Sequence, residues 1–421
     1  MEDVGLTNAE SATASPKRTV CLSCGTNELV SVVSLGDLPL ANAYPLADAV
    51  SDEPRFPLDL AFCPTCSLVQ LQHVVPPLQL FTGYLYFSSY STSMLRHVEA
   101  LGGSLVSSRG LGAESLVVEV ASNDGYLLQF FKKAGIPVLG IEPADTVAEV
   151  AVRERGIPTE VAYFGPELAK KLAGEGKRAD VILGLNVMAH VPDLNGFIEG
   201  LRMMLKPAGV AVVEVPYVRD MVEHTEFDTI YHEHLCYFSV HAVAALVRRH
   251  GLVLQHVERL TVHGGSLRFV IGAGAEHGES ARRLLEEERR LGLDCAAYYA
   301  DFWRSVEHVR AALVATLTDL RGRGATIAGY GAAAKGTILL NYCGLDWRMI
   351  DFVADRNPYK QGRRMPGCGI PVLGPEAIAE RRPDYLLLSA WNLRDEIVEQ
   401  EAAFHRGGGR FIIPIPTVEI L

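Results

Sequence analysis

The chain has 421 residues, which exceeds what one hydrophobic core usually supports, so we expect two or three domains. Apolar residues make up 48% of it and the formal net charge is -11, which together indicate packed cores and disfavour nucleic acid as a partner. No apolar run reaches the roughly 20 residues that a membrane-spanning helix needs, so a membrane partner is not expected. We interpret residues 1–17, which are polar, as a disordered tail.

Two cysteine pairs follow this tail, each with two residues between its thiols. Such a spacing lets both sulfurs of one turn bind the same ion, and two turns complete a tetrahedron. The four thiols belong to Cys21, Cys24, Cys63 and Cys66. Four thiolates leave no open position, so the pattern predicts a structural Zn²⁺ site in a zinc-binding domain of residues 18–78, with four unrelated thiols as the alternative. The other four cysteines are isolated, which is typical of the reducing cytoplasm, where we expect the protein to act.

Two successive alternations of apolar runs and helical segments predict an α/β fold for the rest of the chain. The first alternation has apolar runs typical of buried parallel strands at Leu116–Val120, Val138–Ile141, Val181–Leu185 and Val210–Val215. The second has expected strands near Thr326–Tyr330, Met349–Val353, Tyr385–Ser389 and Arg410–Pro414. Charged helices over Glu279–Leu320 would join two Rossmann-like domains, which we place at residues 79–300 and 301–421.

The first strand leads into a turn of small and polar residues, Ala121–Gly125, and then into a helix. Such a turn lets the amino-acid end of a cofactor lie against the backbone, and Glu142 at the end of the next strand could accept both hydroxyls of a ribose. The pattern resembles the first two motifs of class I methyltransferases, although Ala121 and Asn123 replace glycines, and a purely structural turn is the alternative. The predicted S-adenosylmethionine site consists of Ser88, Glu119, Ala121, Ser122, Asn123, Asp124, Gly125, Tyr126, Glu142 and Asn186.

Titratable side chains gather in the segment Tyr231–His234, after the last strand of the first alternation. A single histidine is more often structural, but two histidines, a glutamate and a tyrosine at the carboxyl edge of a parallel sheet favour a reaction site. Histidine titrates near neutrality and tyrosine can donate to a developing oxyanion, so the cluster suits proton removal. Upstream, the hydroxyl-rich segment Tyr84–Ser91 is interpreted either as core or as a cap over the cofactor.

A glycine-rich turn, Gly329–Gly336, follows a strand of the second alternation and opens a helix. Such turns cradle phosphates, and Asp355 after the next strand could bind a ribose. In isolation these features would suit NAD, which gives the rival hypothesis of an NAD-dependent oxidoreductase acting on a nucleotide sugar. A structural glycine turn is the other alternative.

Five motifs occur in one order: the cysteine pairs, Tyr-x-Tyr-x-Ser-Ser, Glu-Val-Ala-Ser-Asn-Asp-Gly, Tyr-His-Glu-His and Gly-Tyr-Gly-Ala-Ala-Ala-Lys-Gly. Together they resemble the zinc-containing sugar C-3′-methyltransferases of bacterial deoxysugar and antibiotic biosynthesis, over essentially residues 18–421. The resemblance implies a nucleotide-linked 4-keto-deoxysugar substrate, usually dTDP-linked, that is methylated at the carbon beside the ketone. It also implies a structural zinc ion and a C-terminal domain that binds the nucleotide.

Residue roles are carried over from this resemblance only at matching positions. His234 would be the base, with Tyr231 and Glu233 in support, while Tyr86 and His190 would lie in the same pocket. His232 matches the motif but could lie behind the site. The residues that would contact the substrate are Tyr84, Tyr86, Lys335, Asp355, Asn357, Lys360 and Gln361. We expect a monomer, and a third hypothesis is a non-catalytic adaptor built on the zinc ribbon.

Overall fold

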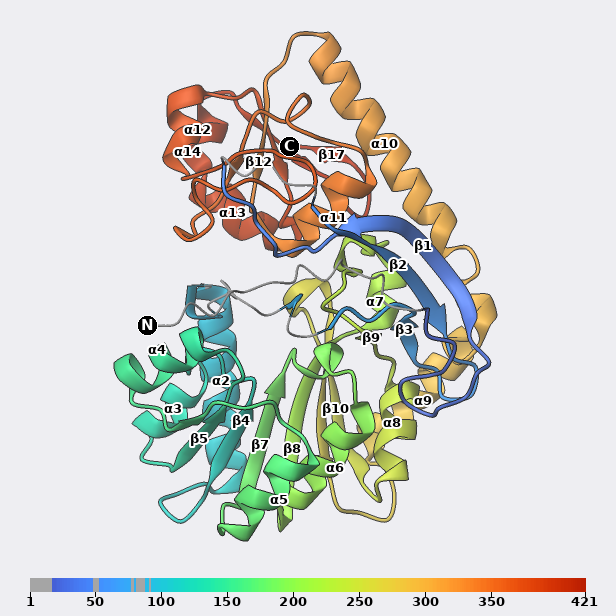
Figure 1. Cartoon of the computed structure of the whole chain (residues 1–421), viewed down its shortest axis with the longest axis vertical. Helices are drawn as coiled ribbons and strands as arrows, with labels where there is room; N and C mark the ends of the chain where they lie inside the picture. The colour runs from blue at the N-terminus through green and yellow to red at the C-terminus, as the bar shows by residue number, and fades with distance from the viewer. Residues whose placement is uncertain (1–16, 48–52, 77–78, 81–87, 91) are drawn as a thin grey trace, which may run out of the picture.

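The computed structural model describes residues 17–47, 53–76, 79–80, 88–90 and 92–421, and the expectations for residues 1–16, Tyr84 and Tyr86 lie outside this part of the chain. Three β-sheets organise the described residues (Figure 1). A four-stranded sheet and a seven-stranded sheet lie beside each other, and a six-stranded sheet forms the other lobe. Within the described residues, no helix is both long enough and apolar enough to cross a lipid bilayer.

The small sheet is antiparallel, in the order β1-β2-β3-β9. Its strands are β1 (Val30–Pro39), β2 (Arg55–Phe62), β3 (Val69–Leu71) and β9 (Cys236–Tyr237). The last strand comes from more than 160 residues further along the chain than β3, where Val69 pairs with Tyr237 and Gln70 with Cys236. The zinc-binding domain is therefore joined to the middle domain by main-chain hydrogen bonds.

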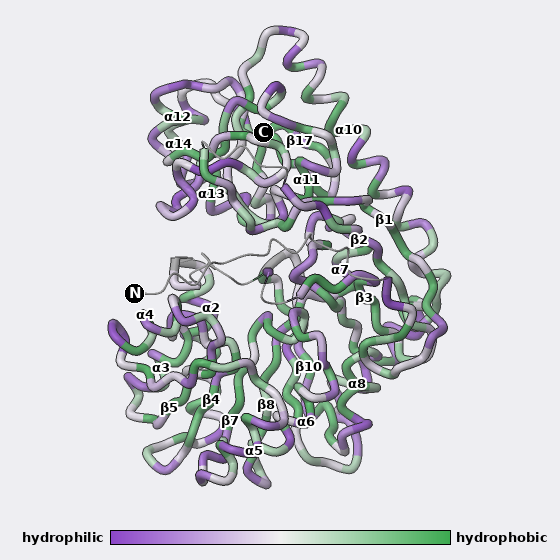
Figure 2. The backbone as a smooth tube through the Cα atoms, viewed as in Figure 1, coloured by the Kyte–Doolittle hydropathy of each residue, from purple (hydrophilic) through white to green (hydrophobic). Residues whose placement is uncertain are grey.

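The seven-stranded sheet has the order β10-β11-β8-β7-β4-β5-β6, with β11 antiparallel to both of its neighbours and the other pairs parallel. Its strands are β4 (Val117–Val120), β5 (Val138–Ile141), β6 (Thr159–Glu160), β7 (Ala179–Leu185), β8 (Leu205–Pro216), β10 (Val253–Leu260) and β11 (Ser266–Gly272). The four expected strands are thus present. Helices cover both faces, and the hydropathy colouring shows apolar strands inside (Figure 2).

The helical segments of this domain alternate with its strands. The α-helices are α2 (Thr92–Arg109), α3 (Leu128–Lys133), α4 (Asp145–Arg155), α5 (Pro166–Gly174), α6 (Leu194–Met204), α7 (Val218–Glu223), α8 (Val240–Arg249) and α9 (Glu279–Leu291). Short 3₁₀ helices are η1 (Ser88–Tyr90), η2 (Met188–His190), η3 (Phe227–Thr229), η4 (Val262–Gly264) and η5 (Ala296–Tyr299). Side-chain caps fix the N-termini of α6 and α8. Asp193 accepts from the amide of Gly196 at the start of α6, and Ser239 accepts from the amide of Ala242 at the start of α8.

The C-terminal sheet has the order β14-β13-β12-β15-β16-β17, parallel except for β17. Its elements are β12 (Ile327–Tyr330), α11 (Ala334–Tyr342), β13 (Val353–Ala354), β14 (Val372–Leu373), α12 (Glu376–Arg381), β15 (Tyr385–Leu388), η6 (Trp391–Leu393), α13 (Arg394–Gln400), α14 (Ala402–Arg406), β16 (Arg410–Ile413) and β17 (Glu419–Ile420). The long helix α10 (Phe302–Gly322) runs from the lower lobe to this one (Figure 1). The expected helical connection between two α/β domains is present.

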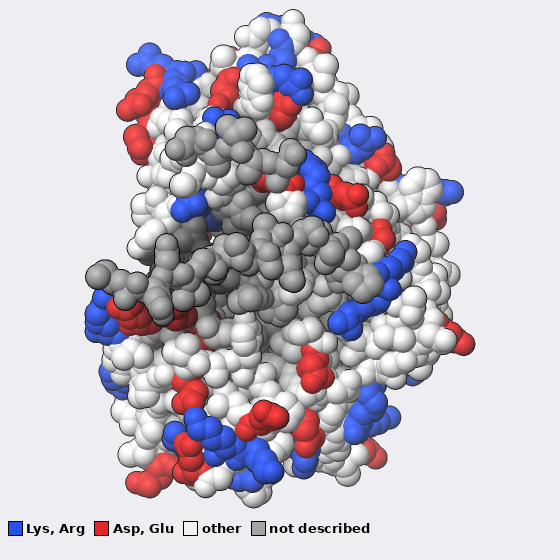
Figure 3. Space-filling view, in the orientation of Figure 1, with Lys and Arg blue, Asp and Glu red and all other residues white. Residues whose placement is uncertain are grey.

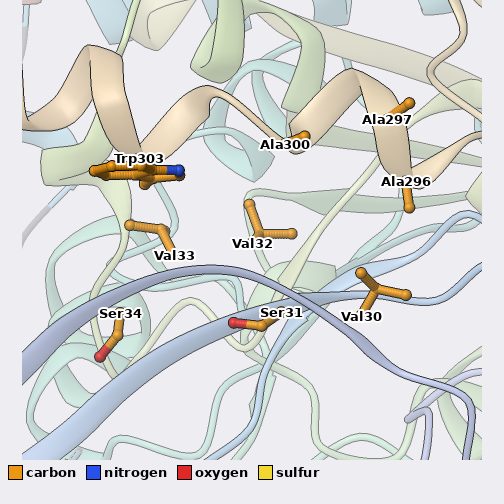
Figure 4. A pocket seen from close by; sticks show the side chains of 9 residues that line it. All are labelled: Val30, Ser31, Val32, Val33, Ser34, Ala296, Ala297, Ala300 and Trp303. Atoms are coloured by element: carbon orange, nitrogen blue, oxygen red, sulfur yellow. The ribbon is translucent and has the colours of Figure 1, made fainter.

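A shallow groove of about 570 Å³ lies between the edge strand β1 and the segments η5 and α10 (Figure 4). Its lining residues are Val30, Ser31, Val32, Val33, Ser34, Ala296, Ala297, Ala300 and Trp303. None of these side chains exchanges protons near neutral pH, so the groove cannot supply acid–base chemistry. The reaction site therefore lies elsewhere in the molecule.

Candidate active site

The four cysteine sulfurs of the zinc-binding domain converge. All lie within 4.8 Å of one another, with separations of 3.5 Å for Cys21 to Cys66, 3.5 Å for Cys24 to Cys63 and 3.6 Å for Cys63 to Cys66. A tetrahedral Zn²⁺ with bonds of about 2.3 Å would hold its sulfurs about 3.8 Å apart, so the donor set fits zinc. The amides of Ser23 and Cys24 point at the Cys21 sulfur, which favours the thiolate.

The cofactor turn follows β4 in a conformation that glycine normally provides. Ala121, Asn123 and Gly125 have φ values of 57°, 48° and 76°, all in the left-handed region. The replacement of glycine at the first two positions therefore leaves the turn intact. Asn123 is further fixed because its side-chain oxygen accepts from the amide of Ser88 at 3.0 Å.

Three carboxylates surround this turn. Glu142 accepts from the amides of Asn123 and Ala144, each at 2.9 Å, and Arg155 lies 3.4 Å from Asp124. Burial, with the charges of Asp124 and Glu142, raises the pKa of Glu119 well above its ordinary range. The two carboxylate oxygens of Glu119 have no hydrogen-bond partner among the described residues. This acidic surrounding suits a ligand that carries a sulfonium, an ammonium group and ribose hydroxyls.

The remaining predicted cofactor residues lie at or near the same edge of the sheet. Ser122 and Tyr126 are buried beside the turn, and the Ser122 hydroxyl has no hydrogen-bond partner within the part of the chain that is described. Asn186 follows the neighbouring strand β7 with a φ of 56°, and its amide donates to the carbonyl of Glu214 at 2.8 Å. The carboxyl ends of β4 and β7 thus present Asn123 and Asn186 at one edge of the sheet.

Replacing Gly125 by alanine should weaken both the fold and cofactor binding. The residue has a positive φ, and an added Cβ would lie 3.0 Å from Ile157 Cγ1. We expect a loss of roughly 1–2 kcal/mol in unfolding free energy and weaker S-adenosylmethionine binding, measured by thermal unfolding and calorimetric titration. Gly135→Ala is the control, because Gly135 has a φ of 78° and open space around it. Equal cofactor affinity in both variants would contradict this role of the turn.

The cluster after β8 forms around His234. Its Nδ1 lies 3.0 Å from the carbonyl oxygen of Thr229, and its Nε2 lies 2.6 Å from the hydroxyl of Tyr231. A carbonyl can only accept, so Nδ1 carries the proton and Nε2 of the neutral ring is left as an acceptor. This tautomer is the one that a general base requires.

His190 joins this cluster to the cofactor side of the sheet. Its ring lies 4.9 Å from that of His234, edge to face, and its pKa is lowered to about 4 by burial. The amide of Leu235 donates to the carbonyl of Ala189 at 2.8 Å, which ties the loop to η2 at the end of β7. His190 is therefore neutral at physiological pH and packs between the base and the cofactor edge.

Glu233 and His232 face the zinc-binding domain. Glu233 is buried and accepts from the side-chain amide of Asn42 at 2.7 Å, and His232 Nε2 lies 3.1 Å from the carbonyl of Phe56. Burial raises the pKa of Glu233 to about 7, while Asn42 and the cation of Lys360 partly offset this. His232 lies in the interface between the domains, behind the base.

The burial of Glu233 predicts a measurable pH dependence of stability. Between its ordinary pKa near 4.5 and its folded pKa of about 7, the folded protein keeps a proton that the unfolded chain releases, so stability falls as pH rises. Glu233→Gln removes this effect and keeps an acceptor for Asn42. We expect the stability of the variant relative to wild type to rise by roughly 1–3 kcal/mol from pH 5 to pH 8 in denaturant titrations. The exposed Glu114→Gln is the control, and a pH-independent difference for Glu233→Gln would contradict the burial argument.

The glycine-rich turn of the C-terminal domain lies against the zinc-binding domain. The hydroxyl of Tyr44 and the ammonium of Lys360 donate to the carbonyl of Ala332 at 2.5 and 2.7 Å, and Asp355 accepts from the amide of Ala332 at 2.6 Å. Lys335, in the first turn of α11, places its ammonium 4.5 Å from the ring centre of Trp391.

Two residues that are predicted to contact the substrate have side chains engaged within the fold. The buried ammonium of Lys360 points at the turn, and both carboxylate oxygens of Asp355 are held by the amides of Ala332 and Asn357. Lys360 is enclosed because Tyr44 of the zinc-binding domain packs against it and the turn, whereas Asp355 is held by amides of its own domain. Asn357 accepts from the amide of Tyr359, Gln361 donates to the carbonyl of Asp355, and both residues are half-buried.

Sequence reasoning missed several contributors. Asn42 bonds Glu233 and Trp391 packs on Lys335 from distant segments. Thr229 lies two residues before Tyr231 and contacts His234 through its main-chain carbonyl, which no side-chain pattern reveals. Charged side chains of both signs are interspersed over the visible face of both lobes (Figure 3).

The fold and the site define an S-adenosylmethionine-dependent methyltransferase with a structural zinc site. Family models match residues 21–81 as a zinc binding domain, 94–257 as a methyltransferase domain and 261–416 as a C-methyltransferase C-terminal domain. The chain is 39% identical to C-methyltransferase NovU of Streptomyces niveus over 95% of this chain and 96% of the relative. The protein therefore belongs to the family of C-methyltransferases that includes NovU.

Further relatives and solved structures match smaller parts of the chain. A ubiquinone biosynthesis O-methyltransferase of Bartonella tribocorum is 31% identical over 97 residues, 23% of this chain and 39% of the relative. The magnesium protoporphyrin IX methyltransferase structure of Synechocystis PCC 6803 is 14% identical, with a TM-score of 0.33, and the match covers 43% of this chain and 79% of that one. Membership of the C-methyltransferases favours methyl transfer over the oxidoreductase and adaptor hypotheses.

Proposed function

We propose that the protein methylates a nucleotide-linked 4-keto-deoxysugar, dTDP-linked, at the carbon beside the ketone, C-3′, in deoxysugar and antibiotic biosynthesis. The observation that carries this proposal is His234, whose Nε2 is an acceptor because its Nδ1 is bonded to the carbonyl of Thr229. Methylation at carbon requires a carbanion, and a neighbouring ketone is what makes its proton removable by a histidine.

The proposed reaction has two steps. His234 Nε2 takes the proton from C-3′, and the electron pair moves to the ketone oxygen to give an enolate. The Tyr231 hydroxyl, which lies beside Nε2 in the structure, turns from Nε2 to the ketone oxygen when substrate binds, which frees the Nε2 lone pair for the C-3′ proton and leaves the hydroxyl as a donor to the enolate oxygen. Tyr86 is proposed to lie in the same pocket. S-adenosylmethionine supplies an electrophilic methyl group, which the enolate carbon accepts as the carbon–sulfur bond breaks.

Binding of the nucleotide part is assigned to the C-terminal domain. Lys335 in the first turn of α11 would neutralise the pyrophosphate, as a cation at a helix start beside a glycine-rich turn can do. Asn357 and Gln361 on the adjoining loop would complete the contact, and Tyr84 is proposed to take part in it. Asp355 and Lys360 are proposed to contribute by holding the shape of the turn.

The test is a reaction with a dTDP-linked 4-keto-6-deoxysugar and S-adenosylmethionine, followed by mass spectrometry and two-dimensional NMR of the product. The proposal predicts one added methyl group with carbon–carbon connectivity at C-3′. A methyl group on oxygen or at C-5′, or transfer to substrates without a ketone, would refute the substrate assignment. A size-exclusion run in the same buffer tests the expected monomer, and cell fractionation tests the expected cytoplasmic location.

A further inference from the structure

The C-terminal domain contacts the loop that carries His234 through one buried hydrogen bond. The indole nitrogen of Trp391, in η6, donates to the Asp228 carboxylate at 2.7 Å. Asp228 lies in η3 and is fully buried, and Trp391 is 9% exposed. The mechanism proposed above uses neither residue. An isolated buried carboxylate is unfavourable, so this contact between domains requires an explanation.

The segment that carries Asp228 is a tight, internally bonded turn. The amide and the hydroxyl of Thr229 both donate to the carbonyl of Glu226, at 3.1 and 2.7 Å, and the amide of Ile230 donates to the carbonyl of Phe227 at 3.0 Å. Such a turn moves as a unit. Its position therefore depends both on the packing of Phe227 against Tyr342 and on what holds the Asp228 side chain.

The opposite side of the same turn faces the base. The carbonyl of Thr229 accepts from His234 Nδ1 at 3.0 Å and from the hydroxyl of Tyr237 at 3.3 Å. This carbonyl selects the tautomer in which Nε2 is unprotonated. Asp228 and Thr229 are adjacent, so a displacement of one shifts the other.

We propose that Trp391 is a positioning residue for methyl transfer, which holds the Thr229 carbonyl, and thereby the His234 tautomer, through its hydrogen bond to Asp228. The inference rests on the proposed role of His234. It assigns the C-terminal domain a part in proton abstraction in addition to binding the nucleotide.

The charges around the contact between Trp391 and Asp228 favour a strong hydrogen bond. Lys335 lies over the Trp391 ring, and its charge lowers the pKa of both Asp228 and Glu226 against the larger effect of burial. The pKa of Asp228 is about 6, so the carboxylate is mostly ionised at neutral pH and the hydrogen bond is charge-assisted. Lys335 also connects the glycine-rich turn to this contact, because it lies in the first turn of α11 and packs on the Trp391 ring.

The test is Trp391→Phe, which keeps an aromatic ring and removes the donor. The ring contact between Phe227 and Tyr342, 5.3 Å between centroids, keeps η3 and α11 together in this variant. We expect kcat to fall roughly tenfold to a hundredfold, with the Kd for S-adenosylmethionine within a few-fold of wild type. In ¹⁵N NMR of labelled histidine, His234 should change from one tautomer to a mixture. Trp303→Phe, in the outer groove, is the matched control and should leave both readouts unchanged.

A second variant keeps the inference testable if Trp391→Phe folds poorly. Asp228→Asn retains an oxygen that can accept from the indole, so we expect most of the tautomer preference to remain. Unchanged kcat or an unchanged His234 tautomer in folded Trp391→Phe would overturn the inference. His234→Asn in the same assay separates failure of the proposed function from failure of the inference about Trp391. If His234→Asn remains active, the proposed function fails. If His234→Asn is inactive and Trp391→Phe is normal, only the inference about Trp391 fails.

Discussion

Replacing His234 by asparagine should reduce methyl transfer by about 10²–10⁴-fold while the affinity for S-adenosylmethionine stays within a few-fold of wild type. Asparagine can still donate to the Thr229 carbonyl, but it has no group that takes a proton near neutral pH. The cofactor turn around Asn123 is formed by other strands, so cofactor binding should persist. Initial rates with labelled S-adenosylmethionine and calorimetric titration with S-adenosylhomocysteine measure the two effects.

His232 provides the matched control for this variant because it lies in the same loop. Its Nε2 bonds the carbonyl of Phe56, at the interface with the zinc-binding domain. We expect His232→Asn to lower the unfolding temperature and to keep kcat within about tenfold of wild type below that temperature. Wild-type turnover in His234→Asn would exclude His234 as the base.

Removing the zinc ion should unfold the small sheet and should stop the reaction as a consequence. Structural zinc contributes on the order of 10 kcal/mol to small zinc domains, so Cys66→Ser or a strong chelator should lower the unfolding free energy by roughly 5 kcal/mol. The loss of structure extends to the catalytic loop, because β9 begins two residues after His234 and pairs with β3 of this sheet. Thermal unfolding, metal analysis and turnover are measured on the same sample.

The exposed Cys295 supplies the control for zinc removal. Cys295→Ser should keep one zinc ion per chain, normal stability and normal turnover, since Cys295 lies apart from the four converging sulfurs. If chelation abolished turnover while the unfolding temperature stayed unchanged, the zinc ion would act in the chemistry and not in the fold.

Segments with strong local patterns were predictable from the sequence. The apolar runs at Val138–Ile141 and Val210–Val215 became buried strands because parallel strands are covered on both faces. The cysteine spacing predicted the metal site because two thiols separated by two residues can bind the same ion. The strand expected near Met349–Val353 begins only at Val353, because the amides of Met349 and Ile350 turn back to the carbonyl of Asp346.

Contacts between domains were not predictable, because no local pattern encodes them. The pairing of β9 with β3 and the bond from Asn42 to Glu233 join segments separated by more than 160 residues. Burial of Lys360 has the same origin, since its side chain is enclosed where Tyr44 packs on the glycine-rich turn. The sequence showed that the titratable residues Tyr231–His234 follow β8. The orientation of their side chains depends on contacts with the other two domains.

All three domains hold the loop between η3 and β9. The zinc-binding domain bonds it through Asn42 and β3, the methyltransferase domain through Ala189, and the C-terminal domain through Trp391. A base that must meet both a cofactor and a nucleotide-linked substrate requires such positioning, since small displacements cost large factors in rate.

The most direct test of the account is proton exchange without methyl transfer. The ketosugar is incubated in D₂O with the protein and S-adenosylhomocysteine, and loss of the C-3′ proton signal is followed by NMR. We predict exchange with the wild-type protein and none above background with His234→Asn. Exchange at the wild-type rate in His234→Asn, or its absence in a wild-type protein that methylates the same sugar, would contradict abstraction of this proton by His234.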